Sequence, residues 1–408
     1  MKNLNIIFVA NELDNTNLNG PNVVFFNIIK TICLNESQFD KGFKFYFLVP
    51  ENFNFNYFDI YCKASEFDIY KLKNNKLITD SKKINFIKLK INNKIGLFLT
   101  ISILKKLGNN YVILYPKLTY LPFLKNQIAF LYDLPLEKRY LINSVNLKEN
   151  IQKQFFFKKL VINNLKFIFT ISKSVKEDII EFLGVDKIDY VYLGVDHDIF
   201  KPLNKIDLSR YDLKYKNYFF YPAGKLWYRK NIINLLLAFY RLINYSENYK
   251  NIELVITANN YNNLKDRYVF EVRKLIEEYK LNKNIRFMYV DNKEMVNLYN
   301  GAMAVIFSSF YEGFGLPILE SLACKIPILF SDIPVFNEIF NENIFKFDPN
   351  DVDSIYFHLK NFLEINLKED NKELDRIIKL GYKKSFSFKW LNTVKNLLVK
   401  IESIIDKE

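Results

Sequence analysis

The sequence predicts an α/β protein made of two Rossmann-like, doubly wound parallel-sheet domains that face each other across a cleft. Short apolar runs of β-type residues alternate with longer helical patterns, which is typical of repeated βαβ units. The 408 residues, half of them hydrophobic, can bury a core in each of two domains. A polar connection at 194–217, which holds Pro202, separates two sets of strands, so we predict domains at 1–202 and 203–384.

Eleven apolar runs are expected to be strands of these two sheets. In open α/β sheets, ligands bind beyond the carboxyl ends of the strands, so the loops that follow these runs are where a site is expected. The runs of the first half are 4–10, 43–49, 111–115, 128–132, 167–170 and 189–192, and those of the second half are 218–221, 253–256, 285–289, 304–307 and 328–330.

The scarcity of cysteine and histidine excludes several classes of protein. Cys33, Cys62 and Cys324 are an odd number and far apart, so neither a disulfide framework nor a cysteine zinc site is expected. His197 and His358 are the two histidines, which argues against a multi-histidine metal centre and a histidine general base.

Two sequence features bear on where the protein works. No run approaches the roughly 18–20 apolar residues of a membrane span, and the apolar stretch 6–10 is too short for a signal peptide. We therefore expect a cytoplasmic protein.

The net charge of +13 lies mainly in the first half, because residues 1–202 carry 28 basic against 19 acidic side chains. Basic and aromatic residues interleave at 81–90 and 152–159, a pattern that can contact an anionic membrane surface or nucleic acid. We expect peripheral contact with the inner face of a membrane and no nucleic-acid partner. A solvated basic face in a lysine-rich sequence explains the same pattern without any partner.

The most informative stretch reads as strand, loop and helix around a Gly-Leu-Pro sequence. Pro317 suits the first turn of a helix, and Gly315 lets the backbone approach a ligand closely. The amides of Gly315 and Leu316 would then point at an anion such as phosphate. Glu320, one turn inside the helix, could reach a ribose, and Glu312 precedes the helix. An ordinary helix start with an acidic first turn is the alternative.

Two other loops follow predicted strands in the same way. Lys225 and Lys230, ahead of a helix predicted at 232–243, could converge on a diphosphate and stabilise its negative charge, although both could also be plain surface lysines. The loop that ends at Gly20 opens another helix, with Asn19 as a plausible cap, and an ordinary turn explains it equally well.

Seven ordered segments together resemble one family, the retaining glycosyltransferases of the GT-B fold, family 4, also called the glycosyltransferase group 1 type. The most specific is the pair Glu312 and Glu320, which matches the family's E-x(7)-E pattern. The resemblance runs nearly from end to end. The other matching segments are 170–178, a "GVD…F.P" segment at 194–202, a "GR…KN" segment at 224–231, 331–334 with Glu338, 347–349, and 386–390 before a terminal helix.

The resemblance implies a donor site in the second domain. Glu320 would bind the donor's ribose and Glu312 its sugar hydroxyls, while Lys225 and Lys230 would hold the diphosphate. The catalytic residues are then Glu312, Lys230 and Lys225. The remaining donor-binding residues are Gly20, Tyr132, Asp133, Gly224, Gly313, Phe314, Gly315 and Leu316.

Two positions depart from the family's pattern. Tyr132 replaces the histidine of its "HD" pair and keeps a hydroxyl that can donate a hydrogen bond. Lys225 stands where arginine is usual, which keeps the charge but loses bidentate geometry. The family's last helix crosses back to the first domain, so the resemblance places 385–408 there.

The activity implied is transfer of a hexose, with retained configuration, from GDP-mannose or a UDP-sugar to a glycan or lipid-linked acceptor in surface polysaccharide or glycoconjugate synthesis. The leaving phosphate would take the acceptor's proton, and neither a metal nor another cofactor is required. The Asp-x-Asp pairs at 196–198 and 351–353 are not expected to bind metal, because they lie in the connection and at a predicted helix start. A catalytically inactive nucleotide-sugar-binding subunit, a nucleotide-sugar epimerase and a nucleic-acid binder remain as alternatives.

Overall fold

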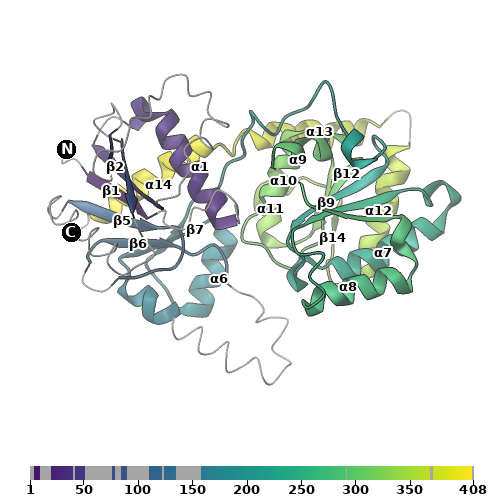
Figure 1. Cartoon of the computed structure of the whole chain (residues 1–408), viewed down its shortest axis with the longest axis horizontal. Coiled ribbons are helices and arrows are strands. Elements are labelled where there is room, and N and C mark those ends of the chain that lie inside the picture. Colours follow the sequence, from purple (N-terminus) through teal and green to yellow (C-terminus); the bar gives the residue numbers. More distant parts are fainter. Residues whose placement is uncertain are drawn as a thin grey trace. The chain divides into compact units, whose positions relative to one another are not determined.

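A computed structural model gives the structure of the chain (Figure 1). It describes residues 4–9, 20–39, 42–50, 76–78, 84–89, 110–121, 124–134, 158–290, 292–367 and 371–406. The chain forms two compact units. Unit 1 comprises Met1–Leu193 and Trp390–Glu408, and unit 2 comprises Gly194–Lys389.

Unit 1 is built on an eight-stranded sheet of order β3-β4-β2-β1-β5-β6-β7-β8. Every neighbouring pair is parallel except β3 and β4. The chain switches direction of winding between β1 and β5, as in doubly wound folds. The strands are β1 (Leu4–Val9), β2 (Phe43–Pro50), β3 (Lys76–Ile78), β4 (Ile84–Leu89), β5 (Tyr111–Tyr115), β6 (Gln127–Phe130), β7 (Phe167–Thr170) and β8 (Ile188–Tyr190).

Aromatic rings fill much of the core between this sheet and its helices. Phe8 of β1 packs edge-on against Phe25 of α1, which in turn meets Phe130 of β6. The carboxyl-terminal helix α14 packs on α1, and its Thr393 hydroxyl donates to the Tyr192 carbonyl. The described helices of unit 1 are α1 (Gly20–Leu34), η1 (Glu36–Phe39), α6 (Lys173–Leu183) and α14 (Trp390–Ile405).

Unit 2 has a fully parallel six-stranded sheet of order β11-β10-β9-β12-β13-β14. The chain starts at the centre with β9, moves outward through β10 and β11, then returns to the other side of β9 with β12. The carboxyl ends of β9 and β12 therefore flank the topological switch point, where doubly wound sheets bind ligands. The strands are β9 (Tyr218–Gly224), β10 (Glu253–Ala258), β11 (Ile285–Met288), β12 (Ala304–Phe307), β13 (Ile328–Ser331) and β14 (Lys346–Phe347).

Helices cover both faces of the second sheet, with α7, α8 and α12 on one side and α9, α10 and α11 on the other (Figure 1). Successive residues of β9 show why, since Phe219 packs on Phe362 of α12 while Phe220 packs on Tyr299 of α9. The helices are η2 (Ser209–Tyr211), η3 (Tyr228–Lys230), α7 (Ile232–Tyr245), η4 (Glu247–Tyr249), α8 (Arg267–Glu278), η5 (Leu281–Lys283), α9 (Asn292–Gly301), α10 (Leu316–Ala323), α11 (Pro334–Phe340), α12 (Val352–Asn366) and α13 (Lys372–Ser385).

All eleven predicted strands occur, and three of them, β5, β7 and β12, have the predicted bounds. The sequence did not reveal β3, β4 or β14. β4 mixes apolar residues with Asn85 and Lys88, a composition that favours a basic surface segment, while β3 and β14 are only three and two residues long. Asn19, Cys62, residues 81–83 and 90 of the first basic segment and residues 152–157 of the second lie outside the described residues.

The connection between the two units belongs to unit 2 from Gly194 onward, whereas the sequence-based division falls after residue 202. Hydrogen bonds explain the difference, because the Val195 N–H donates to the Phe388 carbonyl and Asn300 Nδ2 donates to the Lys201 carbonyl. The second crossing lies between Lys389 and Trp390, where the sequence-based division falls between 384 and 385.

Within the described ranges, no helix combines the length and the hydropathy that a membrane crossing would need.

Candidate functional site

The loops that follow β9 and β12 carry the candidate site of unit 2. β9 ends at Gly224, whose φ of +67° lies in the left-handed region that glycine tolerates best, and the chain then turns into η3. β12 ends at Phe307, and the loop beyond it leads to α10. Because both strands end at the switch point of the sheet, their loops lie side by side.

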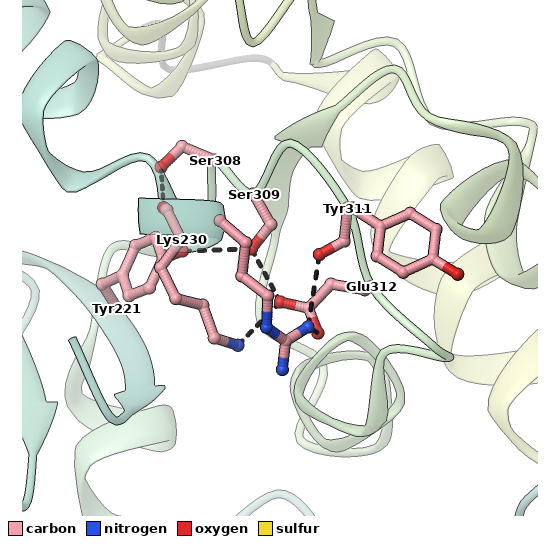
Figure 2. A network of polar contacts seen from close by, with 7 residues as sticks. Tyr221, Lys230, Ser308, Ser309, Tyr311 and Glu312 are labelled. Atoms are coloured by element: carbon pink, nitrogen blue, oxygen red, sulfur yellow. Dashed lines mark hydrogen bonds and ion pairs between the residues drawn. The ribbon is translucent and has the colours of Figure 1, made fainter. Parts of the chain in front are cut away.

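The carboxylate of Glu312 is the centre of a buried polar network (Figure 2). Its Oε1 accepts hydrogen bonds from Lys230 Nζ at 2.7 Å and from Ser309 Oγ at 2.8 Å. Its Oε2 accepts from Arg229 Nη1 at 2.7 Å. Glu312 is 7% exposed and Lys230 9%, so the ion pair is withdrawn from water. Two cations against one carboxylate leave this network with one excess positive charge.

Backbone contacts lock η3 against the loop after β12. The Phe310 N–H donates to the Arg229 carbonyl at 2.8 Å, and the Tyr221 hydroxyl donates to the Lys230 carbonyl at 2.8 Å. Ser308 Oγ also donates to the Lys230 carbonyl, at 3.2 Å. The positions of both cations are thus fixed by backbone as well as by their charged partner.

The electrostatics of Glu312 favour a permanently ionised carboxylate. Burial alone would raise its pKa, but the charges of Arg229 and Lys230 outweigh burial and hold the pKa of Glu312 below its ordinary value. The Lys230 ammonium also lies 4.7 Å from the centre of the Phe307 ring, a second favourable contact for a desolvated cation.

Gly315 caps the amino end of α10 in a conformation that favours glycine. Its φ is +136°, and an added Cβ would lie 3.1 Å from Ile339 Cδ1 and 3.2 Å from Phe336 Cε1. Within the described residues, the N–H groups of Gly315 and Leu316 have no hydrogen-bond acceptor. Pro317 lies in the first turn, so the helix start offers two amides and a favourable dipole to an anion.

Glu320 lies one turn into α10, where its environment differs from that of Glu312. Burial raises the pKa of Glu320 to about 7, and the hydrogen bond that its Oε2 accepts from the Tyr299 hydroxyl, at 2.5 Å, opposes this rise only in part. The two glutamates of the motif are therefore pushed in opposite directions, one held as an anion and one poised to titrate near neutral pH.

Lys225 takes no part in the hydrogen bonds of Glu312. Its side chain is exposed, and its Nζ lies 4.7 Å from the centre of the Trp227 ring. The Arg229 guanidinium lies 5.8 Å from the same ring. Of the two lysines predicted to converge, the structure places only Lys230 against Glu312, and the second cation there is Arg229.

The remaining predicted positions divide between the units. Gly313 and Phe314 are buried in the loop between Glu312 and α10. Gly20, Tyr132 and Asp133 belong to unit 1, with Gly20 at the start of α1 and the other two after β6. The Tyr132 ring stacks on Phe130 with its centre 5.6 Å away, and the buried Tyr132 hydroxyl has no hydrogen-bond partner among the described residues.

Sequence analysis did not single out Arg229, Ser309 or Tyr299. Arg229 precedes Lys230 directly, and Ser309 lies three residues before Glu312, so both are close in sequence to residues that were predicted. Tyr299 lies 21 residues before Glu320, and no local pattern connects the two.

A family model described as "Glycosyl transferases group 1" matches residues 207–384. O-antigen chain mannosyltransferase RfbU of Salmonella typhimurium is 28% identical over 220 residues, which are 53% of this chain and 56% of that protein. O-antigen chain mannosyltransferase B of Escherichia coli is 30% identical over 210 residues, 50% of this chain and 53% of that protein. The chain spans about half the length of the curated relatives it matches.

Solved structures resemble the chain over its whole length. A glycosyltransferase from Rickettsia africae superposes with a TM-score of 0.67 and 16% identity over all of both chains. A sucrose-phosphate synthase from Thermosynechococcus elongatus gives 0.70 and 14%, over 99% of this chain and 100% of that one. HepE of Anabaena, in complex with UDP and glucose, gives 0.65 and 13%, over 98% and 100%. These likenesses confirm the predicted GT-B fold.

Replacing Lys230 should destabilise unit 2, because Glu312 would lose a buried partner. We expect Lys230→Met to lower the free energy of unfolding by about 3 kcal/mol, measured by urea denaturation. Lys225→Met is the matched control and should stay within about 0.5 kcal/mol, since this lysine is exposed. Equal effects of the two variants would contradict the buried ion pair.

The raised pKa of Glu320 should make stability depend on pH. Below about pH 4.5 the carboxyl is protonated in both the folded and the unfolded state. Above about pH 7 it is ionised in both, and the folded state solvates the charge less well than water does, so its contribution to stability falls as pH rises between these values. Glu320→Gln should therefore be more stable relative to wild type at pH 8 than at pH 5, by about 3 kcal/mol. Glu342→Gln, at an exposed position, is the matched control and should show no such difference between the two pH values. If Glu320→Gln also shows none, the pKa of Glu320 is not raised.

Proposed function

We propose that the chain, whose residues 207–384 match the model of the group 1 glycosyl transferases, transfers a hexose from a nucleotide-diphosphate sugar to a hydroxyl group. The acceptor is a glycan or a lipid-linked saccharide of surface polysaccharide or glycoconjugate synthesis. Transfer retains the anomeric configuration, and it needs neither a metal nor another cofactor.

The observation that carries this proposal is the network of Glu312, Lys230 and Arg229 beside the start of α10. An excess positive charge and the amides of Gly315 and Leu316 lie at one switch point. A diphosphate is the anion that such a combination of fixed cation and helix start accommodates best.

The proposed mechanism gives each group a separate task. As the bond between the sugar and the diphosphate breaks, negative charge grows on the leaving phosphate, and Lys230 stabilises it, with exposed Lys225 able to swing onto the same group. The phosphate itself takes the proton of the acceptor hydroxyl, so no histidine base is needed. Glu312, held ionised, orients the donor sugar through its hydroxyls, and Glu320 binds the ribose.

The donor is proposed from the relatives. Two of them are named O-antigen chain mannosyltransferases, which supports a mannosyl donor such as GDP-mannose. The Anabaena protein HepE was solved with UDP and glucose, which supports a UDP-sugar as the second candidate. Gly20, Tyr132 and Asp133 are proposed to approach the donor from unit 1.

Turnover should depend on Glu312 more strongly than nucleotide binding does. With GDP-mannose or UDP-glucose as donor and a lipid-linked acceptor extract, Glu312→Gln should lower the rate of sugar transfer at least 100-fold, because the donor sugar loses its charged contact. Nucleoside diphosphate affinity should change less than threefold. Glu342→Gln is the matched control and should retain the wild-type rate. Nucleotide binding without turnover in the wild-type chain would point to an inactive binding subunit instead.

The basic first half also supports a place at the cytoplasmic face of a membrane, with no nucleic-acid partner. Residues 1–202 carry a net charge of +9. The protein should sediment with vesicles containing anionic lipid at low salt and be released as salt rises. If the protein stays in solution with these vesicles at low salt, the membrane proposal is wrong.

A further inference from the structure

The two carboxylate oxygens of Glu320 have different surroundings. Oε2 accepts the short hydrogen bond from Tyr299, at 2.5 Å. Oε1 accepts no hydrogen bond from any described residue, and it is not among the fully buried atoms that lack a partner. One oxygen is thus anchored from inside unit 2, while the other is open to a ligand.

Tyr299 is held rigidly enough to act as that anchor. Its side chain is completely buried on α9, and its ring meets two others edge-on. The ring centre lies 5.1 Å from that of Phe220 on β9 and 5.7 Å from that of Phe200 in the connection between the units. Because the ring is packed on both sides, the hydroxyl has one available direction.

The residue after Tyr299 fixes the end of α9 to the same connection. Asn300 Oδ1 accepts from the Leu203 N–H at 3.0 Å, and its Nδ2 donates to the Lys201 carbonyl at 3.1 Å. The tyrosine therefore stands on a helix end that is tied down by backbone contacts from a segment distant in the sequence.

We propose that Tyr299 is a positioning residue for nucleotide binding: its hydroxyl fixes the Glu320 carboxylate so that Oε1 meets the ribose hydroxyls of a nucleoside diphosphate. This inference rests on the proposed function. A free glutamate side chain loses rotamer entropy when it is ordered. Tyr299 removes that cost before the ligand arrives, which is how preorganised sites gain affinity.

Besides Tyr299, a buried thiol and a lysine belong to the electrostatic surroundings of Glu320. Cys324, at the end of α10, is a buried thiol that interacts electrostatically with Glu320, and the half-buried Lys216 interacts with Cys324. Burial lowers the pKa of Lys216 to about 8, and its Nζ donates to the Ala302 carbonyl at 2.6 Å. Within the described part of unit 2, Tyr299 is the group that donates a hydrogen bond to Glu320.

A double-mutant cycle tests the proposal, with GDP and UDP as probes in isothermal titration calorimetry. Tyr299→Phe keeps the packed ring and should weaken binding of the preferred diphosphate about tenfold in the wild-type background. In the Glu320→Gln background the same change should cost less than twofold, because Tyr299 then has no carboxylate to position. Tyr218→Phe is the matched control, since this buried hydroxyl donates to the Leu298 carbonyl, and it should leave affinity unchanged.

Two further readouts separate positioning from a general structural role. The 2′,3′-dideoxy form of the diphosphate should bind wild type and Tyr299→Phe with equal affinity, because it lacks the hydroxyls that Glu320 contacts. Loss of the Tyr299 hydrogen bond should also move the pH midpoint of diphosphate binding upward, since that bond stabilises the ionised carboxylate. If Tyr299→Phe fails to fold, Glu320→Asp takes its place, because it keeps the charge and withdraws it from the tyrosine.

The outcomes separate this inference from the proposed function. If wild type binds neither GDP nor UDP, the proposed function fails and the inference fails with it. If wild type binds one of them but Tyr299→Phe costs the same in both backgrounds, the donor site stands and the positioning role of Tyr299 is wrong.

Discussion

The buried ion pair between Glu312 and Lys230 is the interaction on which the candidate site depends. Taking two charges out of water is costly unless their remaining hydrogen bonds are satisfied, and here Ser309 and Arg229 supply them. The pair joins the loop after β9 to the loop after β12. Together with Arg229, it leaves one excess positive charge at the point where a doubly wound sheet opens, and the proposed diphosphate site follows from that charge.

The second glutamate of the motif has the opposite electrostatic character. Glu312 is compensated by cations and stays ionised, while Glu320 is partly buried, accepts a hydrogen bond only from Tyr299 among the described residues, and titrates near neutral pH. Seven residues separate them in sequence, yet the turn at Gly315 gives each its own environment. A single loop and helix start therefore carries an ionised carboxylate, two amides without an acceptor among the described residues, and a second carboxylate that we propose binds the ribose.

The features that could be predicted are properties of consecutive residues. The features that could not be predicted depend on contacts between residues that are distant in the sequence. The β9 and β12 runs, the α10 start and the E-x(7)-E pair were visible because each is a property of consecutive residues. The pairing of Arg229 with Glu312 depends on which loop neighbours which, and the link from Tyr299 to Glu320 depends on how α9 packs on α10. β4 was missed because its mixture of apolar and polar residues is equally well explained by a basic surface segment.

The most direct measurement is the melting temperature of the chain with GDP, UDP, dTDP and CMP, and with their common sugar conjugates. A ligand that binds only the folded state raises the melting temperature, by about 2–4 °C per kcal/mol for a domain of this size. We expect stabilisation by one nucleoside diphosphate and its sugar conjugate, and we expect Lys230→Met to lose it. A flat panel, from a chain that melts cooperatively, would contradict the assignment of unit 2 as a nucleotide-sugar site.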